Sequence, residues 1–315
     1  ILLAADIFPP ESGGPATYVV ALANELVKVG DEVHIVSLNP ESDRSNVKCQ
    51  MSNVKSRSKL FRYLQYLRLL FKQAKYADVV YAMGPVNAGL PAFIAARLRR
   101  KKFVVKVVGD YAWEQGVQRF GVTDLIDAFQ KKESYRFPVR IMKRIEYEVC
   151  RRADAVIVPC LYLRELVTGW GVPAARIKAI YNAPDFRAID EVSAHPNEFW
   201  IVSAGRLVWW KGMDIMIEII DELREEKPDL RLKIVGDGSD MNRLQEAVRQ
   251  RNLTSVVEFT GRLSHDETLG YIHAANLFIL NSAYEGLSHV LLEALSLGVA
   301  VCASRVGGNQ EVILE

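Results

Sequence analysis

Short apolar runs alternate along the chain with longer segments in which apolar residues recur at helical spacing. This alternation is typical of parallel β-sheets covered by helices, because parallel neighbours are joined by helical crossovers. In the first half, the apolar runs predict strands at Ile1–Ala5, Glu32–Ser37, Val79–Ala82, Phe103–Val107, Ala155–Pro159 and Arg176–Ile180. In the second half, they predict strands at Trp200–Ala204, Arg231–Gly236, Val256–Thr260, Leu277–Leu280 and Val299–Ala303, with helices near 211–226, 239–251, 265–275 and 288–298. The predicted fold class is α/β, built on doubly wound parallel sheets.

A polar stretch with two prolines and no sustained period, "NAPDFRAIDEVSAHPNEF", interrupts this rhythm at residues 182–199. We interpret it as a linker over 182–198 between an N-terminal domain, 1–181, and a C-terminal domain, 199–315. With 315 residues and 50% hydrophobic content, the chain is long enough for two cores of ordinary size. Ligands of such sheets bind beyond the carboxyl ends of the strands, so we expect a central cleft lined by the loops that follow strands.

Composition excludes several classes of partner and site. Charge is nearly balanced, with 40 Lys and Arg against 38 Asp and Glu, so no overall field favours nucleic acid. No apolar run approaches the ~18 residues that would span a bilayer. Cys49, Cys150, Cys160 and Cys302 show no C-x-x-C spacing, which argues against a disulfide framework and a zinc site and fits a reducing cytosol. Because the chain opens in "ILLAAD" without an initiator Met and closes in "GGNQEVILE", we expect a fragment of a longer protein. From the cysteines and the lack of a long apolar run, we expect a protein that is cytoplasmic or peripheral at the inner face of a membrane.

Adjacent glycines follow the first predicted strand in "DIFPPESGGPATYVV", where Pro15 starts a helix at the position that proline favours. Gly13 and Gly14 would let backbone N–H groups at the helix start approach a phosphate or a sugar closely. The alternative is a plain turn from strand to helix, because no Walker or G-x-G-x-x-G sequence accompanies the glycines.

Two cations follow the first strand of the second half in "SAGRLVWWKGMD". Arg206 offers a planar fork of donors and Lys211 a point charge, and together they suit a diphosphate at the mouth of a cleft. The alternative is that both side chains only solvate a loop.

Two glutamates with seven residues between them stand in "YEGLSHVLLEALSLG". On one continuous helix, Glu285 and Glu293 would lie about 80° apart and ~12 Å along the axis, so they could not meet as a pair. Ser288 is a favoured cap residue, which places Glu285 on the preceding loop and Glu293 inside the helix. The N–H groups of residues 286–289 would then be placed to bind an anion, with a carboxylate on each side to accept sugar hydroxyls. Apolar residues surround Glu293, so we expect a hydroxyl or cationic partner for its carboxylate.

Taken together and in order, these motifs resemble glycosyltransferase family 4, the "glycosyl transferases group 1". The segments that carry the resemblance are the Gly-Gly loop, "GRLVWWKG", "IVGDGSD", "VEFTGRLS", the two glutamates and "GVAVCASRVGGNQEV". The resemblance spans nearly the whole chain, although family members usually continue beyond its last residues. It implies the GT-B fold, in which two Rossmann-like domains face a central cleft, and a retaining transfer of a sugar from a nucleotide-diphosphate-sugar donor.

The resemblance also implies roles for individual residues. Arg206 and Lys211 match the positions that bind the donor diphosphate, Glu293 matches the glutamate that binds the ribose hydroxyls, and Glu285 matches the one near the transferred sugar. The donor pocket would also be bordered by the backbone of Gly286, Leu287 and Ser288 and, from the N-terminal domain, by Gly14.

This chain departs from the family pattern at the end of the fourth predicted strand. Many members carry a histidine there, close to the reacting sugar, whereas "VVKVVGDYAWEQG" places Asp110 at about that position. Asp110 would hydrogen-bond the donor sugar or orient the acceptor. No D-x-D motif holds a metal on the diphosphate, so we expect no metal and no cofactor, with catalysis by electrostatic stabilisation and positioning.

The acceptor would be a glycan or a lipid-linked glycan, as in cell-surface polysaccharide or glycolipid synthesis. Residues 44–75 carry nine Lys or Arg and no Asp or Glu, and "KLFRYLQYLRLLFKQAK" mixes them with aromatic and aliphatic residues. Such a helix suits an anionic membrane surface. The alternative is a core helix with a basic solvated face, whose core stripe would be Leu60, Leu64, Leu67, Phe71 and Ala74.

Two other functions share this architecture. A nonhydrolysing sugar-nucleotide epimerase would isomerise the donor without consuming an acceptor. A noncatalytic sugar-nucleotide binding protein would bind the donor and release no nucleoside diphosphate, but the four side chains Arg206, Lys211, Glu285 and Glu293 together favour an enzyme.

Overall fold

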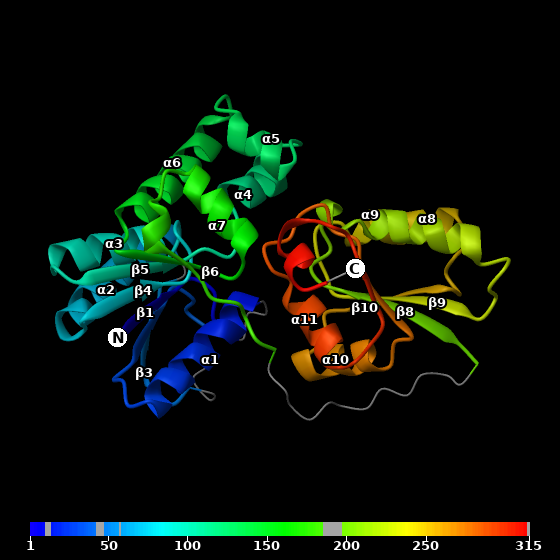
Figure 1. Cartoon of the computed structure of the whole chain (residues 1–315), viewed down its shortest axis with the longest axis horizontal. Helices are drawn as coiled ribbons and strands as arrows, with labels where there is room; N and C mark the ends of the chain where they lie inside the picture. Colours follow the sequence, from blue (N-terminus) through cyan, green and yellow to red (C-terminus); the bar gives the residue numbers. More distant parts are fainter. Residues whose placement is uncertain (10–13, 42–46, 57, 185–196, 314–315) are drawn as a thin grey trace. The chain divides into compact units, whose positions relative to one another are not determined.

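A computed structural model describes residues 1–9, 14–41, 47–56, 58–184 and 197–313. The chain divides into two compact units, unit 1 over Ile1–Tyr181 and unit 2 over Asn182–Glu315 (Figure 1). Most of the predicted linker, residues 185–196, lies outside the described residues.

Unit 1 is a seven-stranded sheet in the order β3-β2-β1-β4-β5-β6-β7, and every pair of neighbours is parallel. Its strands are β1 (Leu2–Ala5), β2 (His34–Ser37), β3 (Gln50–Asn53), β4 (Val79–Ala82), β5 (Lys102–Lys106), β6 (Ala155–Val158) and β7 (Ile177–Ala179). Its α-helices are α1 (Gly14–Lys28), α2 (Lys59–Gln73), α3 (Gly89–Leu98), α4 (Tyr111–Phe120), α5 (Ile126–Lys131), α6 (Phe137–Arg152) and α7 (Leu161–Gly169).

Unit 2 is a five-stranded parallel sheet in the order β10-β9-β8-β11-β12. Its strands are β8 (Phe199–Ala204), β9 (Leu230–Val235), β10 (Val257–Gly261), β11 (Leu277–Leu280) and β12 (Val301–Ala303). Its α-helices are α8 (Met213–Leu223), α9 (Met241–Gln250), α10 (His265–His273) and α11 (His289–Ser296), and two short 3₁₀ turns are η3 (Trp209–Lys211) and η4 (Gly307–Glu311).

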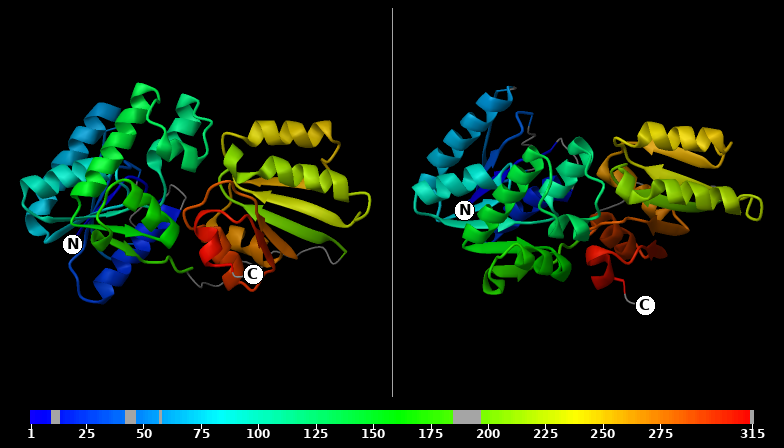
Figure 2. Two further views of the ribbon diagram at one scale, coloured as in Figure 1. Left: turned by 45° about the horizontal axis from the view of Figure 1, so that its top comes forward. Right: turned by 90° about the horizontal axis from the view of Figure 1, so that it is seen from above.

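Helices cover both faces of the sheet of unit 2, as is usual for parallel sheets. Alternate side chains of β8 point to opposite sides, so Ile201 packs under α8 and α9 while Trp200 and Val202 pack under α10 and α11. Figure 2 shows these two helical layers above and below the sheet. The predicted fold class, α/β with doubly wound parallel sheets, is therefore confirmed.

Each sheet has one point where the strand order reverses, and this switch point is where ligands of doubly wound folds bind. In unit 1 it lies between β1 and β4, and in unit 2 it lies between β8 and β11. The loops that follow these four strands are therefore the first place to look for a site in each unit.

Two sequence-based expectations about local structure fail. The edge strand β3 was not predicted, because its sequence, QMSN, is mostly polar and leaves no apolar run. The predicted core stripe of α2 is wrong at Leu60 and Leu64, which are 70% and 51% exposed, whereas Tyr66 and Leu70 are buried. In the part of the chain that the structure describes, no helix is long and apolar enough to cross a membrane.

Candidate functional site

An ion pair joins the two loops at the switch point of unit 2. Lys211, at the end of η3 after β8, donates from Nζ to Oε1 of Glu285 on the loop after β11. The side chains are only 14% and 10% exposed, and Ser282 Oγ donates to the same carboxylate oxygen at 2.6 Å. The pair is thus largely withdrawn from water, where removing one charge would leave the other uncompensated.

Backbone contacts fix the loop that carries Lys211. Ala283 N donates to Trp210 O at 2.7 Å, and Asn281 Nδ2 donates to Gly212 O at 3.3 Å, so the loops after β8 and β11 are held together. Gly212 has a φ of +64°, and a Cβ there would overlap the carbonyl oxygen of Asn281. Only glycine fits this close approach. The glycine caps α8, which therefore begins two residues after Lys211.

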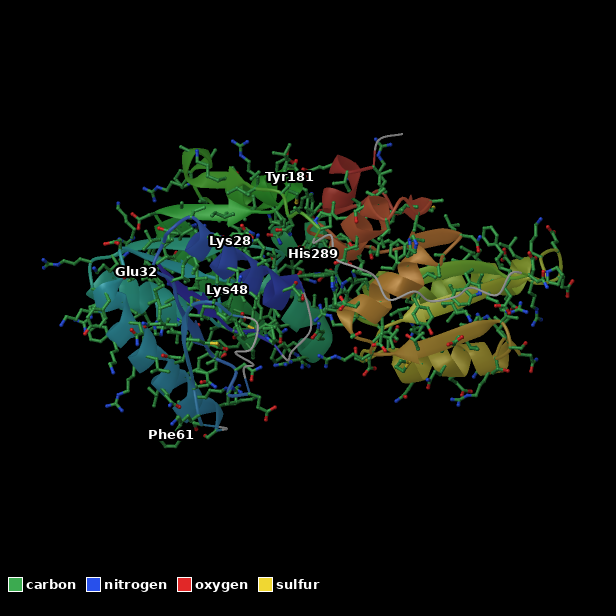
Figure 3. The ribbon with its side chains drawn as sticks, turned by 90° about the horizontal axis from the view of Figure 1, so that it is seen from below. Lys28, Glu32, Lys48, Phe61, Tyr181 and His289 are labelled. Atoms are coloured by element: carbon green, nitrogen blue, oxygen red, sulfur yellow. The ribbon has the colours of Figure 1, made fainter. Side chains whose placement is uncertain are left out.

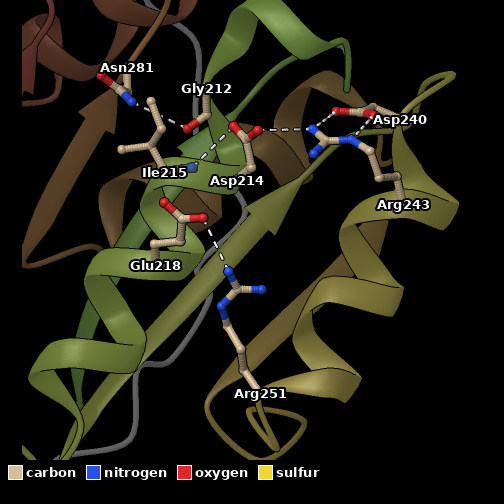
Figure 4. Close-up of polar contacts among 8 residues, drawn as sticks. All are labelled: Gly212, Asp214, Ile215, Glu218, Asp240, Arg243, Arg251 and Asn281. Atoms are coloured by element: carbon tan, nitrogen blue, oxygen red, sulfur yellow. Dashed lines mark hydrogen bonds and ion pairs between the residues drawn. The ribbon is translucent and has the colours of Figure 1, made fainter.

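A polar network on the surface of unit 2 braces the start of α8 (Figure 4). Arg243 of α9 contacts Asp214 of α8 at 3.1 Å and Asp240 at 2.7 Å. These contacts tie α9 to the first turn of α8 and so help to hold η3 in place.

The loop that carries Glu285 is supported from the opposite side by η4. Gly308 N donates to Gly286 O at 2.9 Å, and Ser304 Oγ donates to Ser282 O at 2.5 Å. Gly307 has a φ of +51°, and a Cβ there would overlap the carbonyl oxygen of Glu285. The close packing of the η4 backbone therefore sets the position of this glutamate.

The predicted cap and helix in the Glu285 to Glu293 segment are confirmed. Ser288 is the N-cap of α11 and accepts from Leu291 N at 3.4 Å, so Glu285 lies on the loop and Glu293 lies inside the helix. Gly286 and Leu287 form the turn between them. The first N–H groups of α11 thus follow the Glu285 loop directly in the chain.

Glu293 has a hydrogen-bonding partner on the neighbouring helix. Its Oε1 lies 3.0 Å from Nε2 of His265, the first residue of α10. Burial raises the pKa of the Glu293 carboxyl, and the neighbouring imidazole acts in the opposite direction.

The two glutamates share a feature that matters for ligand binding. Within the described residues, every hydrogen bond that the carboxylates of Glu285 and Glu293 accept goes to Oε1. In each carboxylate, Oε2 therefore keeps its capacity to accept a hydroxyl.

Arg206 is the second predicted cation of this loop. It follows Gly205 at the end of β8 and is exposed, with its guanidinium carbon 5.8 Å from the centre of the Trp210 ring. The structure thus brings Lys211 and Glu285 together, and places Arg206, which is exposed, on the same loop as Lys211.

The two candidate residues in unit 1 have different settings. α1 begins at Gly14, one residue before the helix start predicted at Pro15, while Gly13 lies outside the described residues. Asp110 has no exposed surface: it caps α4 by accepting from Trp113 N at 2.7 Å, and it also accepts from Gln130 Nε2 at 2.7 Å. The predicted contact between Asp110 and a sugar stays a prediction, and the observed role of the carboxyl is to build the start of α4.

Asp110 shares its pocket with a second buried carboxyl, Glu146 of α6. Glu146 accepts from Tyr111 N at 3.0 Å and from Ala112 N at 3.2 Å, so the two acids satisfy the first three N–H groups of α4. Burial, and then the charge of Asp110, raise the pKa of Glu146 well above its usual range, and burial also raises that of Asp110. The raised pKa of Glu146 favours its protonated form in the folded protein.

Sequence reasoning missed two titratable side chains. His265 directly follows Ser264, which forms a capping box with Glu267. This box marks the start of α10 in the sequence, but it does not show that His265 contacts Glu293 on α11. Lys106, at the carboxyl end of β5, is 3% exposed with Nζ 3.2 Å from the centre of the Tyr18 ring, and burial lowers its pKa to about 7. Across the described residues, no three His, Cys, Asp or Glu side chains gather as a metal site would require.

Two family models match the chain and together cover both units. Residues 13–183 match the glycosyl transferase 4-like domain, and residues 185–315 match glycosyl transferases group 1.

Curated relatives match over the same length. The chain is 26% identical over 323 residues to a phosphatidylinositol N-acetylglucosaminyltransferase subunit of Arabidopsis thaliana, covering 99% of this chain and 69% of the plant protein. It is 24% identical over 336 residues to the Homo sapiens protein of the same name, covering 100% of this chain and 64% of the human one. The chain thus spans about two thirds of these relatives.

Solved structures share the fold. Anabaena Alr3699/HepE in complex with UDP-glucose aligns with a TM-score of 0.75 at 18% identity, over 100% of this chain and 83% of that one. Sucrose-phosphate synthase of Thermosynechococcus elongatus aligns with a TM-score of 0.76 at 20% identity, over 99% and 83%. Together with the two parallel-sheet units, these likenesses confirm the predicted GT-B fold.

We predict that Gly307→Ala destabilises unit 2 by about 3 kcal/mol or more, because left-handed strain of about 1 kcal/mol adds to the overlap with Glu285. Gly298→Ala is the matched control: Gly298 has a φ of +71°, but a Cβ there would meet nothing within 4 Å. Its cost should be the strain alone. Denaturant unfolding of both variants measures the difference, and equal costs would show that η4 does not press on the Glu285 loop.

We also predict that the stability of unit 1 falls as pH rises above 4.5, the ordinary pKa of glutamate. Because the pKa of Glu146 is raised in the folded protein, the folded protein holds a proton there that the unfolded chain has already released. Glu146→Gln cannot ionise, so it should remove this slope even though it costs one hydrogen bond to the start of α4. The difference in melting temperature between wild type and variant should shrink from pH 5 to pH 8. A difference that is constant with pH would contradict the raised pKa of Glu146.

Proposed function

The chain belongs to the group 1 glycosyltransferases of the family 4 type, and from this membership we propose that it transfers a sugar, with retention, from a nucleotide-diphosphate-sugar bound by unit 2 to a hydroxyl of an acceptor. The observation that carries the proposal is the Lys211–Glu285 pair at the switch point of unit 2. It presents a cation for the leaving diphosphate beside a carboxylate that accepts sugar hydroxyls.

Lys211 has the donors that such a role needs. An ammonium carries three N–H groups, and Glu285 takes one of them, so the diphosphate can accept another while the pair keeps the lysine in place. Arg206, exposed on the same loop, adds a second cation, and the N–H groups at the start of α11 add partial positive charge. Gly14, at the start of α1, stays a proposed donor-binding residue.

The two uncommitted carboxylate oxygens suit the two sugars of such a donor. We assign Oε2 of Glu293 to the ribose hydroxyls and Oε2 of Glu285 to a hydroxyl of the transferred sugar. The Anabaena protein of the same fold was solved in complex with UDP-glucose, a donor of this class, which supports the assignment by likeness of fold.

The proposed catalysis is electrostatic. Charge grows on the diphosphate as the glycosidic bond breaks, and Lys211, Arg206 and the α11 N-terminus stabilise it more in the transition state than in the ground state. The acceptor hydroxyl attacks from the face that the diphosphate leaves. With two cations and a helix start in place, we propose a reaction that uses neither a metal nor a cofactor.

We further propose that the acceptor is carried by a membrane, on which α2 rests. Leu60, Phe61 and Leu64 are 70%, 65% and 51% exposed, and Figure 3 shows Phe61 projecting from unit 1. Exposed basic residues of α2, such as Lys59 and Arg68, lie near these apolar side chains, and their charge suits anionic lipid. Residues 44–46 and 57 of the predicted basic segment lie outside the described residues. The relatives from plant and human, named for phosphatidylinositol, also favour an acceptor at a membrane.

We predict that Lys211→Ala lowers turnover on the order of 100-fold, because it removes a group that acts on the leaving charge. Glu293→Ala should instead weaken nucleoside diphosphate binding about tenfold, with little change in turnover at saturating donor. Calorimetric titration and nucleotide release measure the two effects. Lys233→Ala is the control, because Lys233 is a similarly buried lysine of unit 2 that pairs with Glu258 at 2.6 Å. Equal losses of turnover in the Lys211 and Glu293 variants would sink the assignment.

We predict that Phe61→Glu with Leu64→Glu abolishes sedimentation of the protein with vesicles that contain phosphatidylserine, because the changes remove apolar contact and reverse charge on α2. The control is Ile215→Glu with Ile219→Glu, two residues of α8 that are 50% and 46% exposed. Equal sedimentation of both double variants would count against membrane contact through α2.

A further inference from the structure

Glu293, to which we assign the ribose hydroxyls, is held by a side chain that the proposed mechanism does not use. Nε2 of His265 lies 3.0 Å from Oε1 of Glu293. Because an ionised carboxylate only accepts hydrogen bonds, Nε2 carries the hydrogen, whether the imidazole is neutral or charged. Within the described residues, this is the one hydrogen bond that the Glu293 carboxylate accepts.

Local sequence places both partners at one edge of the sheet. α10 follows the carboxyl end of β10 and α11 follows that of β11, so both helices begin at the carboxyl edge of unit 2, where its ligands are expected. The capping box of Ser264 and Glu267 makes His265 the first residue of α10. The Ser288 cap places Glu293 in the second turn of α11. The two helices pack on each other, which brings the imidazole to the carboxylate.

The contact engages one oxygen of Glu293 and leaves the other available. Glu293 is largely buried, whereas His265 is exposed. In the described part of the chain, Oε2 of Glu293 makes no hydrogen bond, yet it is not sealed from solvent, so a ligand can reach it. Burial raises the pKa of the Glu293 carboxyl, and His265 opposes this effect. The histidine thus favours the ionised form, which accepts hydroxyl hydrogen bonds at Oε2.

A contact of this kind does little for the stability of the fold, because polar pairs with an exposed partner contribute weakly. Its effect falls on the carboxylate itself. We propose that His265 is a positioning residue for the donor: it fixes the Glu293 carboxylate through Oε1 and so sets Oε2 to accept the ribose hydroxyls. His265 then determines how strongly the protein prefers ribonucleotides without touching them. This inference rests on the proposed function and adds a specificity-determining residue to its donor site.

The test compares ribose with a sugar that lacks its hydroxyls. UDP, GDP or ADP, whichever binds the whole chain most tightly, is titrated calorimetrically alongside its 2′,3′-dideoxy counterpart. The wild type should bind the ribonucleotide more tightly than the dideoxynucleotide. His265→Ala should weaken binding of the ribonucleotide about fivefold, as expected for one hydrogen bond, and should leave the affinity for the dideoxynucleotide unchanged. Turnover at saturating donor should stay at the wild-type value.

Two further variants separate positioning from a loss of structure. His265→Gln keeps an N–H donor at a similar reach, so its affinity for the ribonucleotide should lie within about twofold of the wild-type value. His273→Ala removes an exposed histidine at the other end of α10 and should change neither affinity. In each variant, the dideoxynucleotide reports whether the rest of the site is intact.

Three results would overturn the proposal. His265→Ala could weaken both nucleotides equally, which would mark a structural role, or it could weaken neither, or His265→Gln could lose as much affinity as His265→Ala. Each of these results leaves the proposed function standing, because the wild type still binds a nucleoside diphosphate. A wild type that binds none of the three nucleotides would refute the proposed function itself, and this inference with it.

Discussion

The candidate site of unit 2 depends on the ion pair between Lys211 and Glu285. Two largely buried charges are stable only together, so the pair holds the loops after β8 and β11 in one arrangement across the switch point of the sheet. The surrounding structure serves this arrangement: Gly212 and Gly307 let backbone approach where a side chain would collide. What the pair presents outward, a cation with further N–H groups and a carboxylate with an unused oxygen, is the chemistry that a sugar diphosphate requires.

The same topology places a different chemistry in unit 1. There the loop after β4 carries Asn87, whose side-chain amide is hydrogen-bonded to the hydroxyls of Tyr63 and Tyr111. The two sheets reverse their strand order in a similar way, but the loops at the two switch points carry different side chains.

Much of this organisation could be predicted from the sequence, because strand runs, helix periods and caps are local signals. The Ser288 cap, for example, separates Glu285 from Glu293 without any tertiary information. Contacts between distant segments were not predictable in this way: His265 meets Glu293 only because α10 and α11 pack side by side. The burial of Asp110 next to α4 and the exposure of Leu60 and Leu64 on α2 likewise depend on how the helices pack on the sheet.

The central claim is that the switch point of unit 2 binds the diphosphate of a sugar nucleotide. The most direct measurement is an NMR map of backbone amide shifts as UDP, GDP and ADP are added to the chain. The account predicts that one of them shifts the amides of residues 205–212 and 285–293 together, since these loops are joined through the Lys211–Glu285 pair. Shifts that cluster elsewhere, or no response to any of the three nucleotides, would contradict it.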